Sequence, residues 1–342
     1  MTDPIDRWVE PMREALALAQ SDDAPFGENP RVGCVVVDAD GAVVGRGHHR
    51  GAGTPHAEVD ALAAAGDKAR GATAVVTLEP CRHTGRTGPC TSALIDSGVA
   101  RVVFGQDDPT SLAGGGAEVL RAAGVEVIAG VLADDARAVN EAWTFAQLNG
   151  RPMVTWKVAV SLDGRVAGAD GGPTAITGSA ARIEVHELRA RVGAVVVGTG
   201  TALADDPELT VRLAEAPQGQ PLRVVVGSTP LPSTARLLDG SAPTLLVDEP
   251  DPAALLDLLY SRGVRHVLLE GGPTLAGAFV EARLVDRVIW YVAPLLLGDG
   301  PVAFPPGHTP GGVPLGVAVD DVSVVGEDVR ISGTVTYERA EQ

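Results

Sequence analysis

Apolar and polar positions in the first part of the chain follow two periods. From residue 1 to about residue 148, short runs of β-branched residues alternate with alanine-rich segments whose apolar positions recur at helical spacing. Asp40-Gly41 marks a hairpin turn between the first two runs. The predicted strands are 32–37, 42–46, 74–78, 100–104 and 125–128, and the predicted helices are 56–65, 89–96, 117–123 and 133–147. This order predicts an α/β layered domain.

A domain boundary is predicted at Gly150-Arg151-Pro152, where a helical stretch stops and a new apolar run starts. Beyond it the predicted strands are 153–160, 194–197, 222–226, 244–247, 266–270 and 288–294, with helices at 180–191 and 253–262 and a Gly/Pro-rich loop at 300–316. Several of these strands are nearly continuously apolar, which is typical of central strands. We therefore expect two α/β domains, 1–150 and 151–342.

Composition and charge limit the partners. The chain has 45% hydrophobic and 21% charged residues, as globular proteins do, and no apolar run approaches the roughly 20 residues of a membrane span. Its first ten residues do not resemble a signal peptide, and three cysteines are too few for a disulfide framework. A net charge of −17 repels polyanions, so a phosphorylated ligand would need local arginines. We expect a cytoplasmic protein with no nucleic-acid or membrane partner.

Four residues of the first domain have the chemistry of a hydrolytic zinc site. His56, Cys81 and Cys90 supply one imidazole and two thiolates, which leave the fourth tetrahedral position of a zinc ion for water. Zinc lowers the pKa of that water, and Glu58 can take its proton and return it to a ring nitrogen and the departing ammonia. The order His-x-Glu, Pro-Cys, Cys therefore predicts a Zn²⁺-dependent nucleobase-type deaminase with Glu58 as the catalytic proton shuttle.

Other interpretations of this region remain open. The two cysteines lie nine positions apart rather than three, so the loop 82–89 separates them. A closed structural zinc site with His83 as fourth ligand is the alternative, and it would leave Glu58 without a role. Cys34 lies in an apolar run and is predicted to be a buried small hydrophobe. His48-His49 is expected near the mouth of the site and is assigned no chemistry.

Further motifs accompany the zinc set: Asn29-Pro30-Arg31-Val32-Gly33-Cys34, Pro55-His56-Ala57-Glu58, Thr77-Leu78-Glu79-Pro80-Cys81, and Gly85-Arg86-Thr87 leading to Pro89-Cys90. Together they resemble the bifunctional pyrimidine deaminase-reductases of riboflavin biosynthesis, in which a long inter-cysteine loop is characteristic. The resemblance implies a cytidine-deaminase-like fold and a diaminopyrimidinone substrate that carries a ribosylamino 5′-phosphate. It implies that Asn29 contacts the ring edge and that Arg82, His83 and Arg86 contact sugar or phosphate. The alternative for each is a solvated loop residue or a turn cap.

Two glycine-rich stretches of the second domain follow predicted strands, 198–201 and 271–274. Such turns can hold a dinucleotide phosphate with backbone N–H groups at a helix start, or serve only close packing. Neither is the G-x-G-x-x-G of a dinucleotide fold, so a plain Rossmann domain is not predicted.

The motifs of the second domain are Trp156-Lys157, 161–165, 176–177, Leu188-Arg189, 203–207, 209–212 and 270–275. They resemble the reductase domain of the same family, which has a dihydrofolate-reductase-like fold and uses NADPH. The resemblance implies cofactor contacts from Ala159, Thr201, Asp205, Ser228 and the turn Gly272, Pro273, Thr274, Leu275, Ala276, Gly277 and Ala278. It implies substrate contacts from Arg189, Leu209, Arg212 and Glu270, and it places the catalytic Lys157 at the sugar, where hydride reaches C1′ and ribosyl becomes ribityl.

Simple structural roles are the alternatives for two of these positions. Arg189 would be an exposed helix residue, and Asp205-Asp206 would cap the turn before Pro207. Relatives often carry a small polar residue at Pro173 and a tryptophan at Ala175, so contacts from that loop differ here.

The leading hypothesis is one enzyme that performs zinc-dependent deamination and then NADPH-dependent reduction, and the resemblance implies a homo-oligomer, most simply a dimer. One rival is a zinc deaminase of another nucleoside or base with a non-reducing second domain, and another is a non-catalytic zinc and dinucleotide sensor. The acid that protonates the opened sugar oxygen is Lys157, Asp205 or Glu270, and spacing does not rank them.

Overall fold

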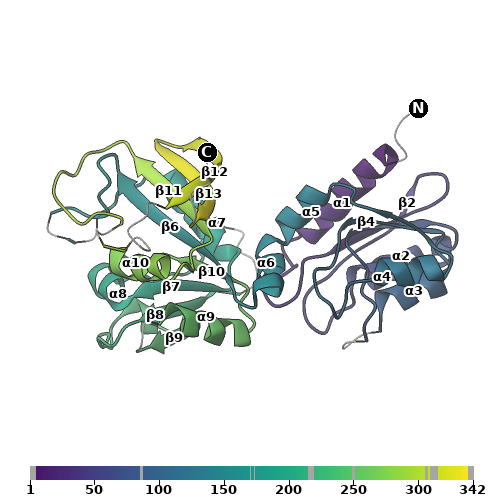
Figure 1. Ribbon diagram of the computed structural model, residues 1–342, viewed down its shortest axis with the longest axis horizontal. Coiled ribbons are helices and arrows are strands. Elements are labelled where there is room, and N and C mark those ends of the chain that lie inside the picture. Colours follow the sequence, from purple (N-terminus) through teal and green to yellow (C-terminus); the bar gives the residue numbers. More distant parts are fainter. Residues whose placement is uncertain are drawn as a thin grey trace. The chain divides into compact units, whose positions relative to one another are not determined.

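The chain forms two compact units, residues 1–149 and 150–342, in the computed structural model. The structure describes residues 5–84, 88–169, 171–172, 174–214, 219–248, 251–304, 307–308 and 315–337. Each unit is built on one β-sheet with helices against it (Figure 1). None of the helices in the described part of the chain has the length and apolar character needed to cross a membrane.

The first unit has a five-stranded sheet in the order β2-β1-β3-β4-β5. Its strands are β1 (Gly33–Val37), β2 (Val43–His48), β3 (Thr73–Leu78), β4 (Arg101–Gln106) and β5 (Glu126–Ala129). Its helices are η1 (Asp6–Trp8), α1 (Val9–Ala19), α2 (Ala57–Ala65), η2 (Gly66–Ala69), α3 (Cys90–Ser97), α4 (Gly116–Ala122), α5 (Ala133–Val139) and α6 (Glu141–Asn149). β1 is antiparallel to β2 and β3, whereas β3, β4 and β5 are parallel.

Helices cover both faces of this sheet, with α1 and α5 on one side and α2, α3 and α4 on the other (Figure 1). Because β1 and β3 are covered on both faces, every residue in them is buried. Close packing sets the position of α2: a Cβ added at Gly47 of β2 would lie 2.4 Å from the backbone nitrogen of Ala61. The start of α2 is therefore held firmly against the sheet.

Two predictions for the first unit are corrected by the structure. Helix α1 was not predicted, although its buried residues Met12, Ala15, Leu16 and Ala19 recur at helical spacing. The single helix predicted at 133–147 is two helices, α5 and α6, which meet at Asn140. The Asn140 side chain accepts a hydrogen bond from Arg31 N at 2.8 Å and donates one to Arg31 O at 2.9 Å. A long-range contact thus interrupts a continuous local helix pattern.

The second unit has an eight-stranded sheet in the order β12-β13-β11-β6-β10-β7-β8-β9. Its strands are β6 (Met153–Ser161), β7 (Ala194–Gly198), β8 (Leu222–Val226), β9 (Thr244–Val247), β10 (His266–Leu269), β11 (Arg287–Ala293), β12 (Gly316–Val325) and β13 (Asp328–Thr336). Its helices are α7 (Ser179–Ala190), α8 (Thr199–Asp205), η3 (Arg236–Leu238), α9 (Pro252–Ser261) and α10 (Pro273–Glu281). The strands from β11 to β9 are parallel, and β13 and β12 add an antiparallel hairpin.

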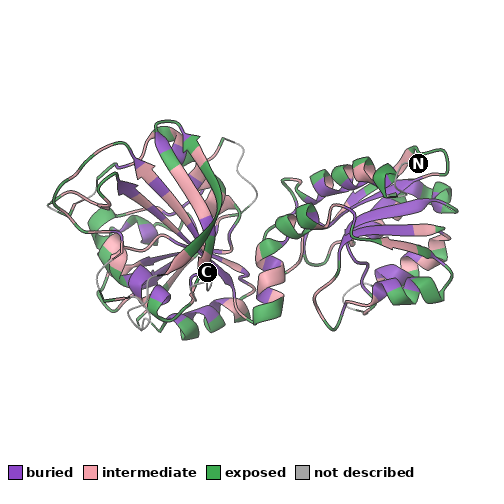
Figure 2. Ribbon diagram, turned by 45° about the horizontal axis from the view of Figure 1, so that its top comes forward, coloured by how far each residue is buried: buried purple, intermediate pink, exposed green. Residues whose placement is uncertain are grey.

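The central strands of both units are buried, while helix faces and strand edges are exposed (Figure 2). Fold class is thus α/β for each unit, as predicted. Two features differ from the prediction: the hairpin of β12 and β13 was not foreseen, and most of 272–278 is helix rather than turn. Gly272 is the N-cap of α10 and Pro273 its first residue, which favours a helix start at this point.

Candidate active sites

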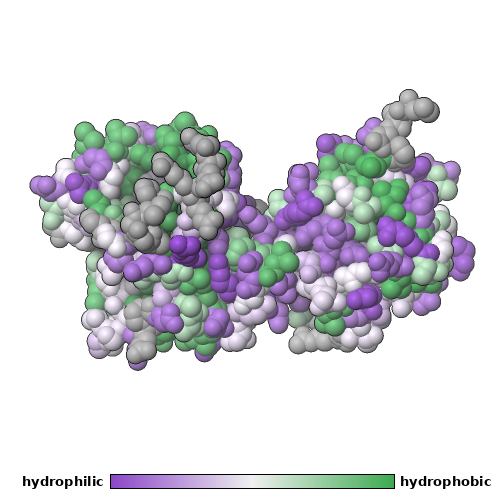
Figure 3. All heavy atoms as spheres, in the orientation of Figure 1, coloured by the Kyte–Doolittle hydropathy of each residue, from purple (hydrophilic) through white to green (hydrophobic). Residues whose placement is uncertain are grey.

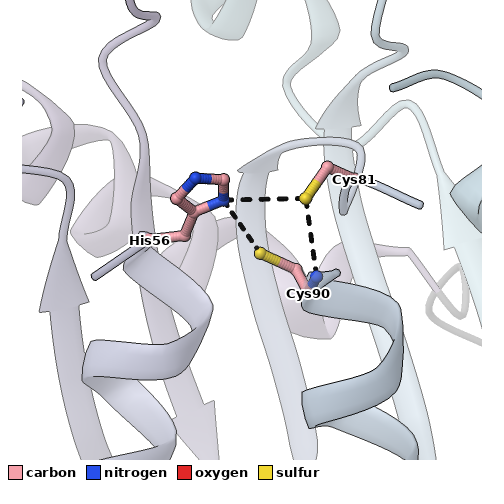
Figure 4. Close-up of side chains that lie close together, drawn as sticks. All are labelled: His56, Cys81 and Cys90. Atoms are coloured by element: carbon pink, nitrogen blue, oxygen red, sulfur yellow. Dashed lines mark hydrogen bonds between the residues drawn. The ribbon is translucent and has the colours of Figure 1, made fainter. Parts of the chain in front are cut away.

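His56, Glu58, Cys81 and Cys90 meet in the first unit because two helices begin beside the end of β3. His56 is the extended N-cap of α2, so Glu58 lies in the first turn of that helix. Cys90 is the first residue of α3, and Cys81 follows β3 by three residues. Figure 4 shows the imidazole of His56 and both sulfur atoms turned toward one another.

The distances within this group suit zinc. His56 Nδ1 lies 3.1 Å from Cys90 Sγ and 3.6 Å from Cys81 Sγ, and all three ligand atoms are within 4.8 Å of one another. A tetrahedral ion with Zn–S of about 2.3 Å and Zn–N of about 2.0–2.1 Å separates N and S by about 3.5 Å. The donor set and its spacing therefore fit a zinc ion with three protein ligands.

The electrostatics of the group favour a thiolate at Cys81 and a poised acid at Glu58, whereas the hydrogen bond with Cys81 raises the pKa of the Cys90 thiol. A hydrogen bond with the Cys90 thiol lowers the pKa of Cys81 to about 4, and His56 contributes further against the effect of burial. Burial raises the pKa of Glu58 to about 7. A carboxyl group with a pKa near neutrality can both take up and release a proton at physiological pH.

A cavity of about 390 Å³ opens onto this group. Asn29, Glu58 and His83 line it, as does His49, which was expected near the mouth of the site without a chemical role, and Asp108, which the sequence had not assigned to a site. The His49 ring meets that of His56 edge to face, with centroids 5.3 Å apart, and Nδ1 of His49 lies 3.1 Å from Pro55 O. Its place directly after β2 agrees with the expectation of a strand end near the mouth of the site.

The other residues predicted for the first unit belong to the loop between the two cysteine ligands and to the apolar core. His83 lies on the cavity wall and does not join the three-ligand group among the residues that the structure describes, which disfavours a closed zinc site. The Arg82 side chain donates to Ser111 O at 3.2 Å, and Arg86 falls outside the described residues. Cys34 is fully buried among apolar side chains, as predicted.

A larger cavity of about 820 Å³ lies in the second unit. It is lined from the end of β6, the starts of α8 and α10, and one face of α7. Predicted residues that line it are Lys157, Ala159, Arg189, Thr201, Asp205, Arg212, Glu270, Gly272, Pro273, Thr274 and Leu275. Ala175 lines it too, and Pro173 is not among the described residues.

Glu270 is the centre of a buried charge cluster in this cavity. It follows β10, whose last residue pairs with Trp156 of β6, so its carboxylate reaches Lys157 Nζ at 3.5 Å. Arg189 donates to both of its oxygens, from Nε at 2.6 Å and from a terminal nitrogen at 3.0 Å. Burial alone would raise the pKa of Glu270, but the two cations outweigh it and hold the pKa at about 2.

Other predicted residues do not line this cavity. Leu209 packs into a hydrophobic core, and Ser228 is exposed after β8. Ala276 and Gly277 are buried within α10, and Ala278 is partly buried there. Their helical positions turn them away from the residues at the helix start.

Two basic residues of α7 also line the cavity and were not singled out from the sequence. Arg182 and His186 share a face of α7 with Arg189, because the three are spaced by four and three residues. His186 Nδ1 lies 3.1 Å from Thr210 O, and Arg212 N lies 3.3 Å from the same nitrogen. That spacing was a signal available in the sequence.

The starts of α8 and α10 offer a place for a diphosphate. Gly198 and Gly272 are their N-caps, and Gly272 N donates to Thr201 Oγ1 at 3.0 Å, which ties the two helix starts together. A Cβ at Gly200 would meet no atom within 4 Å, so the surface above this turn is open. Adjacent helix N-termini suit the phosphates of a dinucleotide.

Two family models match the chain, one for each unit. The model described as the cytidine and deoxycytidylate deaminase zinc-binding region matches residues 8–106, and the RibD C-terminal domain matches residues 152–331. The first match spans His56, Glu58, Cys81 and Cys90, and the second spans the charge cluster around Glu270.

Proteins that are similar over most of the chain include RibD proteins and a protein described as a pyrimidine deaminase/reductase. The riboflavin biosynthesis protein RibD of Mycobacterium tuberculosis is 50% identical over 300 residues, which cover 86% of this chain and 83% of that protein. RibD of Escherichia coli is 42% identical over 323 residues, which cover 84% of this chain and 88% of that protein. The structure of Acinetobacter baumannii RibD has a TM-score of 0.88 at 38% identity and covers 97% of this chain and 99% of its own. A Thermotoga maritima diaminohydroxyphosphoribosylaminopyrimidine deaminase/5-amino-6-(5-phosphoribosylamino)uracil reductase has a TM-score of 0.89 at 32% identity, with 97% and 99% coverage.

Proposed function

The chain belongs to the RibD family of bifunctional riboflavin-biosynthesis deaminase-reductases, and we propose that each of its two cavities carries out one of the two reactions. The first unit deaminates 2,5-diamino-6-ribosylamino-4(3H)-pyrimidinone 5′-phosphate. The second reduces the ribosyl chain of the product to ribityl. The observation that carries the proposal is the convergence of His56, Cys81 and Cys90 beside the buried Glu58.

In the first unit, His56, Cys81 and Cys90 would hold Zn²⁺, which would supply the activated water for hydrolysis. Glu58 moves the protons: its carboxylate takes the two protons of the attacking water in turn, giving one to the ring nitrogen and the other to the amine that leaves as ammonia. Its raised pKa, near 7, suits both directions of transfer. Asn29, which lines the same cavity, binds the ring edge.

In the second unit, NADPH would supply the hydride, and the helix starts at Gly198 and Gly272 would hold its phosphates; Thr201, in the first turn of α8, and Asp205, at the end of that helix, line the same cavity. Arg189 and Arg212 bind the phosphorylated substrate. Glu270 is held ionised by its two cations and accepts hydrogen bonds rather than donating a proton. This leaves Lys157 and Asp205, which both line the cavity, and we propose that the Lys157 ammonium beside Glu270 protonates the opened sugar oxygen.

A coupled assay tests both halves. Zinc-replete protein is given the diaminopyrimidinone ribosylamino phosphate, and ammonia release and NADPH oxidation are followed together. Glu58→Gln is expected to slow ammonia release by about 10²–10⁴-fold, because proton transfer is lost, and to leave reduction of added deaminated substrate intact. Ammonia without NADPH oxidation would remove the reductase assignment and favour the rival deaminase with a non-reducing second domain. If Glu58→Gln leaves every measured property unchanged, the rival hypothesis of a non-catalytic zinc and dinucleotide sensor would be favoured.

We also propose a homodimer in the cytoplasm, formed through the hairpin of β12 and β13. A β-bulge between Val319 and Asp321 brings Val317, Val319, Val322 and Val324 to one face of β12, each more than 40% exposed. Figure 3 shows hydrophobic residues gathered at the end of the second unit that carries these strands. A long apolar edge strand of this kind suits burial against a second copy. Sedimentation of the wild type and of Val322→Lys tests it, and a wild-type monomer at micromolar concentration would refute it.

A further inference from the structure

Glu79 is a buried carboxylate beside the zinc ligands that the proposed deamination does not use. It is 7% exposed and lies between the end of β3 and Cys81. Its Oε1 accepts a hydrogen bond from Ala117 N at 2.9 Å, and its Oε2 accepts one from Asp108 N at 3.3 Å. Burial of a carboxylate is costly unless such donors satisfy it, so this placement needs an explanation.

The two amides that Glu79 binds flank one loop: Asp108 N opens it, and Ala117 N lies directly after it in the first turn of α4. This loop, residues 108–116, runs from just after β4 to the start of α4. Four of its residues line the deaminase cavity, namely Asp108, Thr110, Leu112 and Ala113. One carboxylate therefore fastens both ends of a segment that forms a wall of the cavity.

The same segment is also packed against the turn that carries the zinc ligand. A Cβ at Gly116 would lie 1.8 Å from Pro80 O, so the start of α4 touches the peptide directly before Cys81. Arg82 N donates to Ala113 O at 3.2 Å on the other side of Cys81. The ligand turn and the cavity wall cannot move independently while these contacts hold.

We propose that Glu79 is a positioning residue that keeps the substrate-facing loop 108–116 in register with the zinc ligand Cys81. The inference rests on the proposed deaminase site. Neutralising Glu79 frees one or both ends of the loop, which changes substrate binding, and loosens the peptide that presents Cys81, which changes metal binding.

Glu79→Gln tests this role. The variant keeps the side-chain shape, but its amide NH₂ faces one of the two backbone N–H groups and cannot accept from it. We expect zinc affinity, measured by competition with a chromogenic chelator, to fall about 10–100-fold, the range typical of residues that support metal ligands. The deaminase KM is expected to rise by a larger factor than kcat falls, and NADPH-dependent reduction of deaminated substrate should not change. Glu118→Gln, which removes an exposed charge from α4, is the matched control and should match the wild type in all three measurements.

Gly116→Ala provides a second, independent variant. It pushes the start of α4 away from Pro80 without altering any charge, and it should reproduce the loss of zinc affinity and the rise in KM. Zinc affinity within twofold of the wild type in Glu79→Gln, or in Gly116→Ala if the first variant does not fold, would overturn the proposal. The zinc measurement needs no substrate. A wild type that binds zinc but does not release ammonia would therefore count against the proposed function and leave the test of Glu79 standing.

Discussion

Replacing Glu270 by glutamine removes the anion at the centre of the charge cluster in the second unit. Arg189 and Lys157 then face one another without compensation, and their side chains are only 11% and 17% exposed. A folded-state pKa of about 2, against an ordinary glutamate value of about 4.3, corresponds to about 3 kcal/mol at about 1.4 kcal/mol per pKa unit. Breaking a buried ion pair by removing one partner costs about 3–5 kcal/mol. We therefore expect Glu270→Gln to lower the free energy of unfolding of the second unit by about 3–5 kcal/mol at pH 7.

The sign of the pH dependence follows from the direction of the shift. Because the pKa of Glu270 is lower in the folded state than in the unfolded chain, its contribution to stability is fully present above about pH 4.3 and is lost as the pH falls toward 2. The difference in free energy of unfolding between the wild type and Glu270→Gln should thus be constant from about pH 7 to pH 5. It should become smaller below about pH 4.3.

Hydrogen exchange of peptides along a urea series measures this effect, because it reports the two units separately. Peptides of the first unit serve as an internal reference. Glu281→Gln, whose side chain is 64% exposed, is the matched control and should change stability by less than about 0.5 kcal/mol. A loss below about 1 kcal/mol at pH 7, or a difference that does not narrow in acid, would refute the assignment of a strongly coupled buried charge to Glu270.

Two further predictions concern the metal and the core of the second unit. Chelation of the metal should abolish ammonia release and spare NADPH oxidation on deaminated substrate, since His56, Cys81 and Cys90 all belong to the first unit; loss of both activities would contradict this. Arg223→Met should lower the free energy of unfolding of the second unit by about 3–5 kcal/mol. The reason is that the fully buried Arg223 side chain donates to three backbone carbonyls. If urea unfolding shows that Arg223→Met is as stable as the wild type, this structural role would be contradicted.

The zinc set was accessible from the sequence because its chemistry is recorded in local order. His56 and Glu58 lie two residues apart at a helix start, and a proline directly precedes each of the two cysteine ligands. Hydrophobic periodicity likewise identified most strands to within a few residues, since each strand of a covered sheet must be apolar along its whole length. Family resemblance named Lys157 as a catalytic residue and Arg189 and Glu270 as substrate contacts. It did not indicate that these three side chains pair with one another.

Tertiary structure alone decided which polar groups face one another. Nothing local distinguishes Glu79 as a carboxylate bound to two distant amides, and the expectation that His49 lies near the site did not include its edge-to-face contact with the His56 ring. Leu209 matched a substrate motif, yet it packs into the core. The sequence by itself determined which residue types occur at each helix start and which strands are covered, because propensity and burial act over a few neighbouring residues. The partner of a buried polar side chain comes from strand order and helix docking, and these depend on contacts between residues that are tens of positions apart.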